Sequence, residues 1–89
     1  MFGYTVSMTT NEKTFKKICD IIENELSPIT KGNYLVDVDG SLIQNYRVGC
    51  NKIIIHNDYD IDAVYVDSDI DLSKLLVDYI VVTYNPENV

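Results

Sequence analysis

The chain has 89 residues, of which 46% are hydrophobic, and it carries a formal net charge of −7. This length and composition predict one globular domain over residues 1–89 and exclude a largely disordered chain. The acidic charge repels nucleic acid and anionic membranes, so we expect neither of them as a direct partner.

The charge is unevenly distributed along the chain. Residues 1–54 carry six acids and six bases and sum to zero, whereas residues 55–89 carry eight acids and only Lys74. Such a field steers basic partners toward the second part of the chain. Cys19 and Cys50 have no metal or redox spacing, and the first residues lack a basic, apolar leader. We therefore expect two reduced thiols and a cytoplasmic location.

The beginning of the chain predicts a strand followed by a helix. Phe2–Met8 alternates weakly between apolar and polar residues, as a strand does. Thr9 and Glu12 have the spacing of a capping box, which predicts a helix over Thr10–Leu26 that ends before Pro28. Its apolar residues recur at helical spacing and predict one buried stripe, made of Phe15, Ile18, Cys19, Ile22 and Leu26.

A run of strands is predicted next. Thr30–Asn33 has loop composition, and Asp39-Gly40 is a strong hairpin signal between two β-rich runs. Gly49-Cys50-Asn51 and Asn57–Asp60 have turn composition and separate two further runs. The four predicted strands are Tyr34–Val38, Ser41–Val48, Lys52–His56 and Ile61–Val66.

The end of the chain predicts a short helix over Leu72–Tyr79, capped by Ser68 or Asp69, and a last strand over Ile80–Tyr84. A polar tail then follows Asn85-Pro86. The order β-α-β-β-β-β-α-β predicts an α+β fold, in which a mostly antiparallel sheet of about five to six strands carries the helices on one face.

The most biased segment is Asp58–Asp71, which contains six aspartates and no basic residue. Asp58, Asp60, Asp62 and Asp69 have the spacing of the acids in a calcium loop. However, Ala63 stands where that loop needs glycine, and Asp69 stands where it needs a bidentate glutamate. We predict no metal and no cofactor.

Catalysis is not indicated by the same segment. General acid–base chemistry needs groups whose pKa values are set apart by burial, and clustered, solvated aspartates do not show this. His56 is the only histidine, and a lone histidine at a strand end is typically structural. The sequence has no Gly-rich phosphate loop and no Cys/His zinc spacing. We predict that the protein is not an enzyme.

A protein-binding surface is the third interpretation of this segment. Alternate residues of an extended strand lie about 6.6 Å apart, so each Asp-x-Asp-x-Asp triplet, if extended, presents a row of carboxylates on one face. Such rows can imitate a row of phosphates, and the interleaved tyrosines can serve as anchors. The predicted partner-binding residues are Asp58, Tyr59, Asp60, Asp62, Tyr65, Asp67, Asp69 and Asp71.

In size, in acidity and in the run Asp58-Tyr59-Asp60-Ile61-Asp62 with Asp67-Ser68-Asp69-Ile70-Asp71, the chain resembles small phage-encoded inhibitors that mimic DNA, such as anti-CRISPR proteins and uracil-DNA glycosylase inhibitors. The resemblance implies an inhibitor that occupies a basic, nucleic-acid-binding surface of a host protein. An antitoxin or immunity protein that blocks a basic active site is the alternative, as is an acidic structural domain without mimicry. Lys13, Lys16 and Lys17 could pair with the acidic part of a second copy, so both a monomer and a homodimer remain open.

Overall fold

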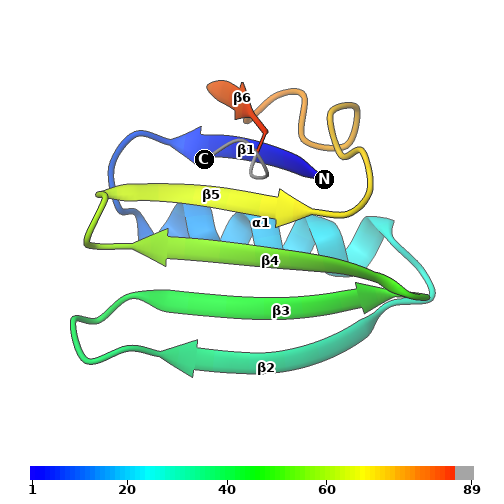
Figure 1. The fold of residues 1–89 in the computed structure, drawn as a ribbon, viewed down its shortest axis with the longest axis horizontal. Coiled ribbons are helices and arrows are strands. Elements are labelled where there is room, and N and C mark those ends of the chain that lie inside the picture. The colour runs from blue at the N-terminus through cyan, green and yellow to red at the C-terminus, as the bar shows by residue number, and fades with distance from the viewer. Residues whose placement is uncertain (86–89) are drawn as a thin grey trace.

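The computed structural model describes residues 1–85 and contains one antiparallel sheet with a helix packed on one face (Figure 1). The sheet has six strands in the order β2-β3-β4-β5-β1-β6. The elements in chain order are β1 (Phe2–Ser7), α1 (Glu12–Glu25), β2 (Thr30–Val36), β3 (Leu42–Val48), β4 (Asn51–Asp58), β5 (Ala63–Ser68) and β6 (Val82–Tyr84). The predicted α+β fold with a mostly antiparallel sheet is therefore confirmed, and the predicted tail at residues 86–89 lies outside the described residues.

The core lies between α1 and the face of the sheet that the helix covers. Strand alternation directs Tyr46, Ile55 and Val66 to this face, where they are buried. The predicted stripe of α1 meets them, with Phe15, Ile18, Cys19 and Ile22 buried and Leu26 partly buried, as a 3.6-residue period requires. The other face of β3, β4, β5 and β1 is not covered by a helix (Figure 1).

The helix begins at a different cap from the one expected. Asn11 is the N-cap, and its side chain accepts a hydrogen bond from the Thr14 N–H. The Thr9–Glu12 capping box is therefore wrong. Thr9 and Thr10 bond to the Asp62 carboxylate instead, and this contact with a distant turn holds them outside the helix.

The predicted second helix over Leu72–Tyr79 is also wrong, because this segment forms successive turns. The Leu76 N–H bonds to the Leu72 carbonyl, but the Tyr79 N–H bonds to the Leu76 carbonyl, so the helical pattern does not propagate. Leu72 and Leu76 are nevertheless buried in the core, as their apolar spacing predicted. No helix within residues 1–85 is long and apolar enough to cross a bilayer.

Several strand boundaries differ from the prediction: β4 is longer than expected, at Asn51–Asp58, and the last strand is shorter, at Val82–Tyr84 rather than Ile80–Tyr84. Thr30–Asn33, expected to be a loop, is part of β2, and a shift of register between Lys31 and Tyr34 marks a bulge there. The strand expected at Ile61–Val66 lies at Ala63–Ser68, because Asp62 has a positive φ of 53° and completes the preceding turn.

The central strand β4 gives a direct test of the core. Replacing Ile55, which is fully buried, with alanine should lower the free energy of unfolding by about 2–5 kcal/mol, since it removes buried methyl groups and leaves a cavity. Val77→Ala, at an exposed position, is the control and should change it by less than about 0.5 kcal/mol. Urea unfolding measures both values, and equal effects would contradict this placement of the core.

Candidate functional site

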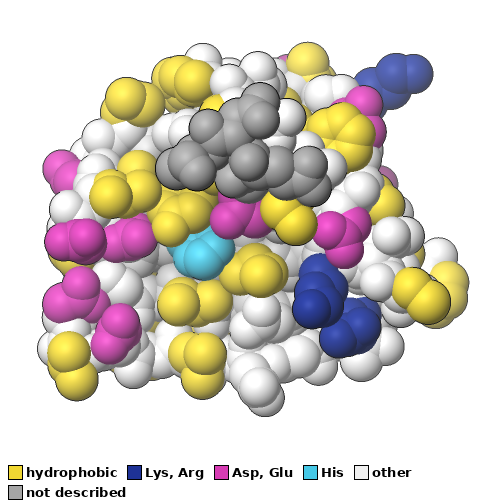
Figure 2. Space-filling view, in the orientation of Figure 1, with side chains coloured by type: hydrophobic (Ala, Val, Ile, Leu, Met, Phe, Trp, Pro, Cys, Tyr) yellow, Lys and Arg dark blue, Asp and Glu magenta, His cyan; other side chains and the backbone are white. Residues whose placement is uncertain are grey.

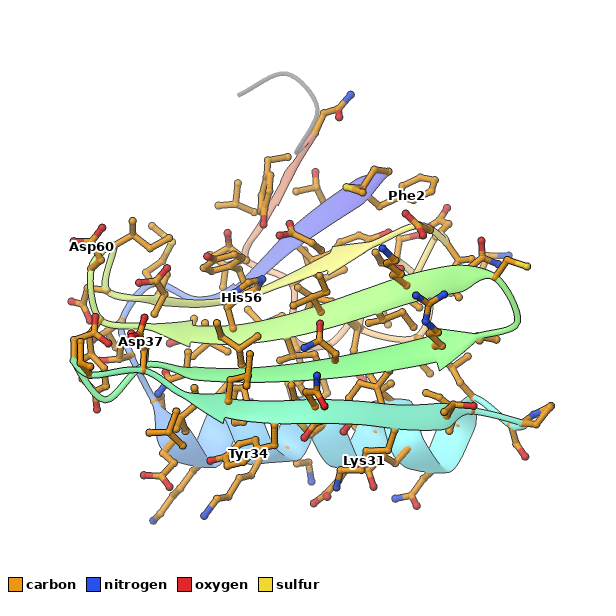
Figure 3. The ribbon with its side chains drawn as sticks, turned by 60° about the horizontal axis from the view of Figure 1, so that its bottom comes forward. Phe2, Lys31, Tyr34, Asp37, His56 and Asp60 are labelled. Carbon is orange, nitrogen blue, oxygen red and sulfur yellow. The ribbon has the colours of Figure 1, made fainter. Side chains whose placement is uncertain are left out.

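Two acidic turns meet at one end of the sheet. Strands β2 to β5 form a meander, so the β2–β3 turn and the β4–β5 turn lie at the same end, where Figure 3 labels Asp37 and Asp60. The turns contribute four aspartates to the lining of one hollow of about 330 Å³. We call these four residues the acidic tip: Asp37, Asp39, Asp58 and Asp60.

The β2–β3 turn is shaped by its own aspartates. Asp37 accepts a hydrogen bond from the Val38 N–H, and Asp39 accepts one from the Ser41 N–H at 2.9 Å. Gly40 has a φ of 89°, a conformation that glycine adopts at little cost. The bonds from the backbone and hydroxyl of Ser41 lower the pKa of Asp39, so this carboxylate is ionised at neutral pH.

The β4–β5 turn is tied to the first turn. The Tyr59 N–H donates to the Ser41 hydroxyl oxygen at 2.9 Å, which links the two loops directly. Asp58 accepts hydrogen bonds from the Asp60 N–H and the Tyr65 hydroxyl. The Asp60 side chain makes no hydrogen bond or ion pair with the described part of the chain. Its carboxylate is therefore available to a partner.

Apolar side chains surround the acidic tip. Val38, Tyr59 and Ile61 are each more than half exposed, and all of them lie on the same two turns as the four aspartates. Protein interfaces usually have an apolar centre and a polar rim, so these exposed apolar groups can supply the centre of a contact and the aspartates its charged margin. The charges can also orient a basic partner.

The uncovered face of the sheet is polarised along the strands. Figure 2 shows most of the acidic side chains of this face gathered at one end, the histidine toward that end, and two basic side chains toward the other end, where a further acidic side chain lies beside them. The basic pair is Arg47 and Lys52, which are cross-strand neighbours on β3 and β4. The acidic tip is therefore set apart from the nearest bases of this face.

A polar cluster occupies the centre of the same face. The His56 ring stacks on the Tyr65 ring, with centroids 4.3 Å apart and planes 10° apart. His56 Nε2 lies 3.5 Å from an Asp67 oxygen and is buried without a hydrogen-bond partner in the described part of the chain. The Tyr84 hydroxyl donates to Asp67 at 2.7 Å, and its ring lies so close over Gly3 that a Cβ there would clash with it.

The pKa shifts in this cluster favour structure over catalysis. Burial raises the pKa of Asp67, but the contacts with His56 and Tyr84 outweigh burial, so the net pKa is lowered. Burial, together with the hydrogen bonds to Asp58 and Asp67, raises the pKa of Tyr65 and Tyr84. All three shifts move away from neutrality, whereas a general acid or base needs a pKa near the working pH.

The other aspartates of the acidic segment hold loops in place. Asp62 accepts hydrogen bonds from the Thr9 and Thr10 hydroxyls and from the Thr10 N–H. Asp69 accepts from the Lys52 N–H at 2.8 Å, and Asp71 accepts from the Tyr4 hydroxyl and the Ser73 N–H. These carboxylates accept hydrogen bonds from backbone N–H and hydroxyl groups, and these bonds fix the conformation of the loops.

The eight predicted site residues therefore separate into three groups. Asp58, Tyr59 and Asp60 lie at the acidic tip. Tyr65 and Asp67 belong to the cluster on the uncovered face, while Asp62, Asp69 and Asp71 hold loops. Asp58 ends β4 and Asp67 lies in β5, whereas the other four aspartates lie outside the strands, so neither triplet forms an extended row of carboxylates.

Sequence reasoning missed Asp37 and Asp39, which supply half of the acidic tip. The signal was present, because Asp39-Gly40 predicted a hairpin tip and Asn57–Asp60 predicted another turn. A meander of antiparallel strands brings alternate turns to the same end of a sheet, so these two predictions together imply that the acidic turns meet.

Comparison of this chain with known protein families, curated proteins and solved structures found no match. Its functional assignment therefore depends on the chemistry of the acidic tip.

Metal binding has no geometric support among residues 1–85, where no three or more His, Cys, Asp or Glu side chains are placed to hold an ion. The segment whose spacing resembles a calcium loop, residues 58–69, cannot wrap an ion because Ala63–Ser68 is a strand. We expect an excess of chelator to leave the thermal unfolding midpoint unchanged. Thermal unfolding with and without EDTA measures this, and a large loss of stability would mean that an ion holds the fold.

The Asp62 contacts give a prediction with a defined pH dependence. The hydrogen bonds from Thr10 and Thr9 lower its pKa below the ordinary 3.8, so the carboxylate stabilises the fold above pH 3.8. This contribution is lost as the pH falls through the lower pKa of the folded state. Asp62→Ala should therefore lower the thermal midpoint at pH 7, and its difference from the unsubstituted chain should shrink in acid.

Asp60→Ala is the matched control for this test, because Asp60 lies in the same turn but its side chain has no partner in the described part of the chain. It should leave the midpoint at or above that of the unsubstituted chain, since it also removes a charge from the acidic tip. A loss equal to that of Asp62→Ala would show that the turn tolerates no change, and that the Thr9 and Thr10 contacts are not the cause.

Proposed function

We propose that this protein is a small protein-binding inhibitor whose acidic tip occupies a basic, nucleic-acid-binding surface of another protein. The observation that carries the proposal is the convergence of Asp37, Asp39, Asp58 and Asp60 around one hollow. The finer proposal follows from the resemblance of the acidic segment: the inhibitor is phage-encoded and acts on a host defence protein, as anti-CRISPR proteins do.

The chemistry of the hollow favours a cationic side chain as its occupant. Its volume of about 330 Å³ is at the lower end of ligand-sized sites, and the four aspartates make it strongly electronegative. A guanidinium or ammonium group on a partner can form charge-assisted hydrogen bonds with several of these oxygens at once. The same arginines and lysines bind phosphates when nucleic acid is present, so the acidic tip competes with nucleic acid for them.

The neighbouring apolar groups add contacts that phosphate cannot make. Tyr59 is exposed beside the hollow and its backbone is fixed by Ser41, so little entropy is lost when its turn docks. Electrostatic steering raises the association rate, and the burial of Tyr59 against the partner slows dissociation. Because salt weakens the electrostatic contribution but not the Tyr59 contact, we expect the affinity to fall with salt concentration without vanishing.

The proposal requires a reducing compartment and a chain that stays free of disulfides. Cys19 is buried, Cys50 is exposed, and neither forms a disulfide. Free cysteines of this kind are typical of the cytosol, where nucleic-acid-binding proteins of a host cell also act.

The test uses the immobilised chain and a nuclease-treated bacterial lysate. The unsubstituted chain should retain proteins that duplex DNA then elutes, because DNA and the acidic tip bind the same basic surface. The variant with Asp37→Asn, Asp39→Asn, Asp58→Asn and Asp60→Asn keeps the shape of the turns and removes the charge. Its retention should fall by about tenfold or more, measured by quantitative mass spectrometry of the eluate.

The matched control removes the same charge at exposed positions away from the acidic tip, by Glu12→Gln, Asp20→Asn, Glu25→Gln and Asp78→Asn. It should retain the same proteins as the unsubstituted chain. An equal loss of retained protein in both variants would mean that retention depends on net charge alone, and would contradict a defined site. Retained proteins that DNA does not elute would favour the antitoxin or immunity alternative, in which the blocked surface is not a nucleic-acid site.

A further inference from the structure

The two edges of the sheet are protected to different degrees. The β6 edge has only three residues, whereas β2 has seven, and all seven are exposed. An edge strand presents unpaired backbone groups that can pair with another chain, and proteins usually protect such an edge by shortening, charging or covering it. The β2 edge is long and uncovered, with α1 lying behind β4 and β5 (Figure 1).

The central part of β2 is the segment available for pairing. A bulge between Lys31 and Tyr34 bounds it on one side, and the β2–β3 turn bounds it on the other. The Asp37 N–H bonds inward to the Ser41 carbonyl. Because the direction of backbone groups alternates along an antiparallel strand, Leu35 also bonds inward, and the N–H and C=O groups of Tyr34 and Val36 point outward.

The side chains of this segment are apolar and accessible. Tyr34 and Leu35 are each 50% exposed and Val36 is 63% exposed, and no charge lies among them. A contiguous exposed apolar run on an open edge marks an association site. Three residues are enough for a short antiparallel pairing with another strand.

The charges at the ends of β2 indicate the occupant. Lys31 lies near the start of the strand, and Asp37 and Asp39 follow its end (Figure 3). Lys31 already pairs with Glu23 of α1 at 3.4 Å, but its side chain remains 58% exposed, so a second carboxylate can still approach it. A second copy that pairs antiparallel brings each lysine toward the acidic end of the other copy. β2 also lies in the electrically neutral part of the chain, residues 1–54, where repulsion between copies is smallest.

We propose that β2 pairs antiparallel with β2 of a second copy of this chain, about a two-fold axis at Leu35, and joins the two sheets into one. Tyr34 of each copy then lies opposite Val36 of the other, and these two pairs exchange the outward backbone hydrogen bonds. The two Leu35 residues face each other as a non-hydrogen-bonded pair, with Cα atoms about 4.5 Å apart. The seam is short, so the dimer is weak and concentration-dependent.

Disulfide trapping tests this register. In a Cys50→Ser background, which removes the exposed native thiol, Leu35→Cys places two cysteines across the axis within the Cα separation that a disulfide needs, about 4.4–6.8 Å. Mild oxidation followed by non-reducing electrophoresis should give a cross-linked dimer as the main product.

Asn33→Cys in the same background is the matched control, because it lies on the same exposed strand but away from the axis. In this register the two introduced thiols are offset by four residues, or roughly 13 Å along the strand, which is too far for a disulfide. Leu35→Cys should cross-link at least about tenfold faster than Asn33→Cys. Equal rates, or faster trapping at residue 33, would overturn the proposed register.

Sedimentation velocity over a concentration series tests the dimer without cross-linking. The unsubstituted chain should shift from one chain to two as its concentration rises. Val36→Pro removes an outward N–H that the fold does not use, and an edge strand tolerates proline at such a position, so this variant should stay folded and monomeric. Val82→Lys, on the opposite edge, should still dimerise.

Each contrary result has a definite meaning. A dimer that persists in Val36→Pro, or that is lost in Val82→Lys alone, would place the interface elsewhere and overturn the proposal. A monomer at every concentration would overturn it as well, and would leave the β2 edge to an extended segment of another protein. The substitutions at residues 35, 36 and 82 leave all four aspartates of the acidic tip unchanged, so the dimer can fail while the proposed inhibition holds, and the reverse.

Discussion

The structure depends on how a single helix covers a sheet of six strands. A helix with its side chains is about 10–12 Å wide and strands lie about 4.8 Å apart, so a helix that runs along the strands covers about two of them. The helix α1 packs against β4 at the centre of the core. The segment with Leu72 and Leu76 extends the cover toward β1, where the Leu72 N–H bonds to the Tyr4 hydroxyl. Within the described residues, β2 meets the helix through single side chains: the Tyr34 ring lies 6.4 Å from the Phe15 ring, and Lys31 pairs with Glu23. The rest of β2 stays exposed because the helix is not wide enough to reach it.

Where the helix does not fully cover the sheet, buried polar side chains complete the core by forming hydrogen bonds. The buried Gln44 amide donates to the Gly32 and Asn33 carbonyls, where the bulge in β2 turns them inward. The Asn57 side chain accepts from the Asn11 N–H and so joins the start of the helix to β4. Each buried polar group replaces a water contact with a protein contact, which is what burial demands. The fold thus closes its core with directional bonds at the places where apolar side chains run out.

The acidic segment shows how a fold divides a block of like charge. Asp62, Asp69 and Asp71 are each surrounded by N–H or hydroxyl donors, which stabilise a carboxylate without a basic partner. Asp67 lies under the hydroxyl of Tyr84 in the same way. Asp58 accepts bonds in the same way, from the Asp60 N–H and the Tyr65 hydroxyl. Of the six aspartates in this segment, only Asp60 makes no side-chain bond within residues 1–85, so the acidic tip keeps one carboxylate that the fold does not use.

Much of the fold was predictable, because it depends on local periodicity. The stripe of Phe15, Ile18 and Ile22 and the hairpin at Asp39-Gly40 both came from spacing alone. Two errors have different causes. Gly32 and Asn33 have loop composition and do form the bulge of β2, but the residues on both sides of them pair with β3. Leu72–Tyr79 has helical spacing, but the Leu72 N–H bonds to the Tyr4 hydroxyl of β1. The site was less predictable, because a count of aspartates does not reveal which of them the fold uses for its own bonds.

The place of β1 in the sheet has a consequence for the order of folding. β1 is the first strand along the chain, yet its neighbours β5 and β6 come last. Strands β2 to β5 can pair successively through short turns, whereas β1 must wait until the chain beyond Ala63 is present. A nascent chain that reaches only as far as Asp58 can form a partial meander, but β1 then has no neighbouring strand to pair with. The hydrogen bonds between β1 and β5 can therefore form only after those that join β2, β3 and β4 have become possible.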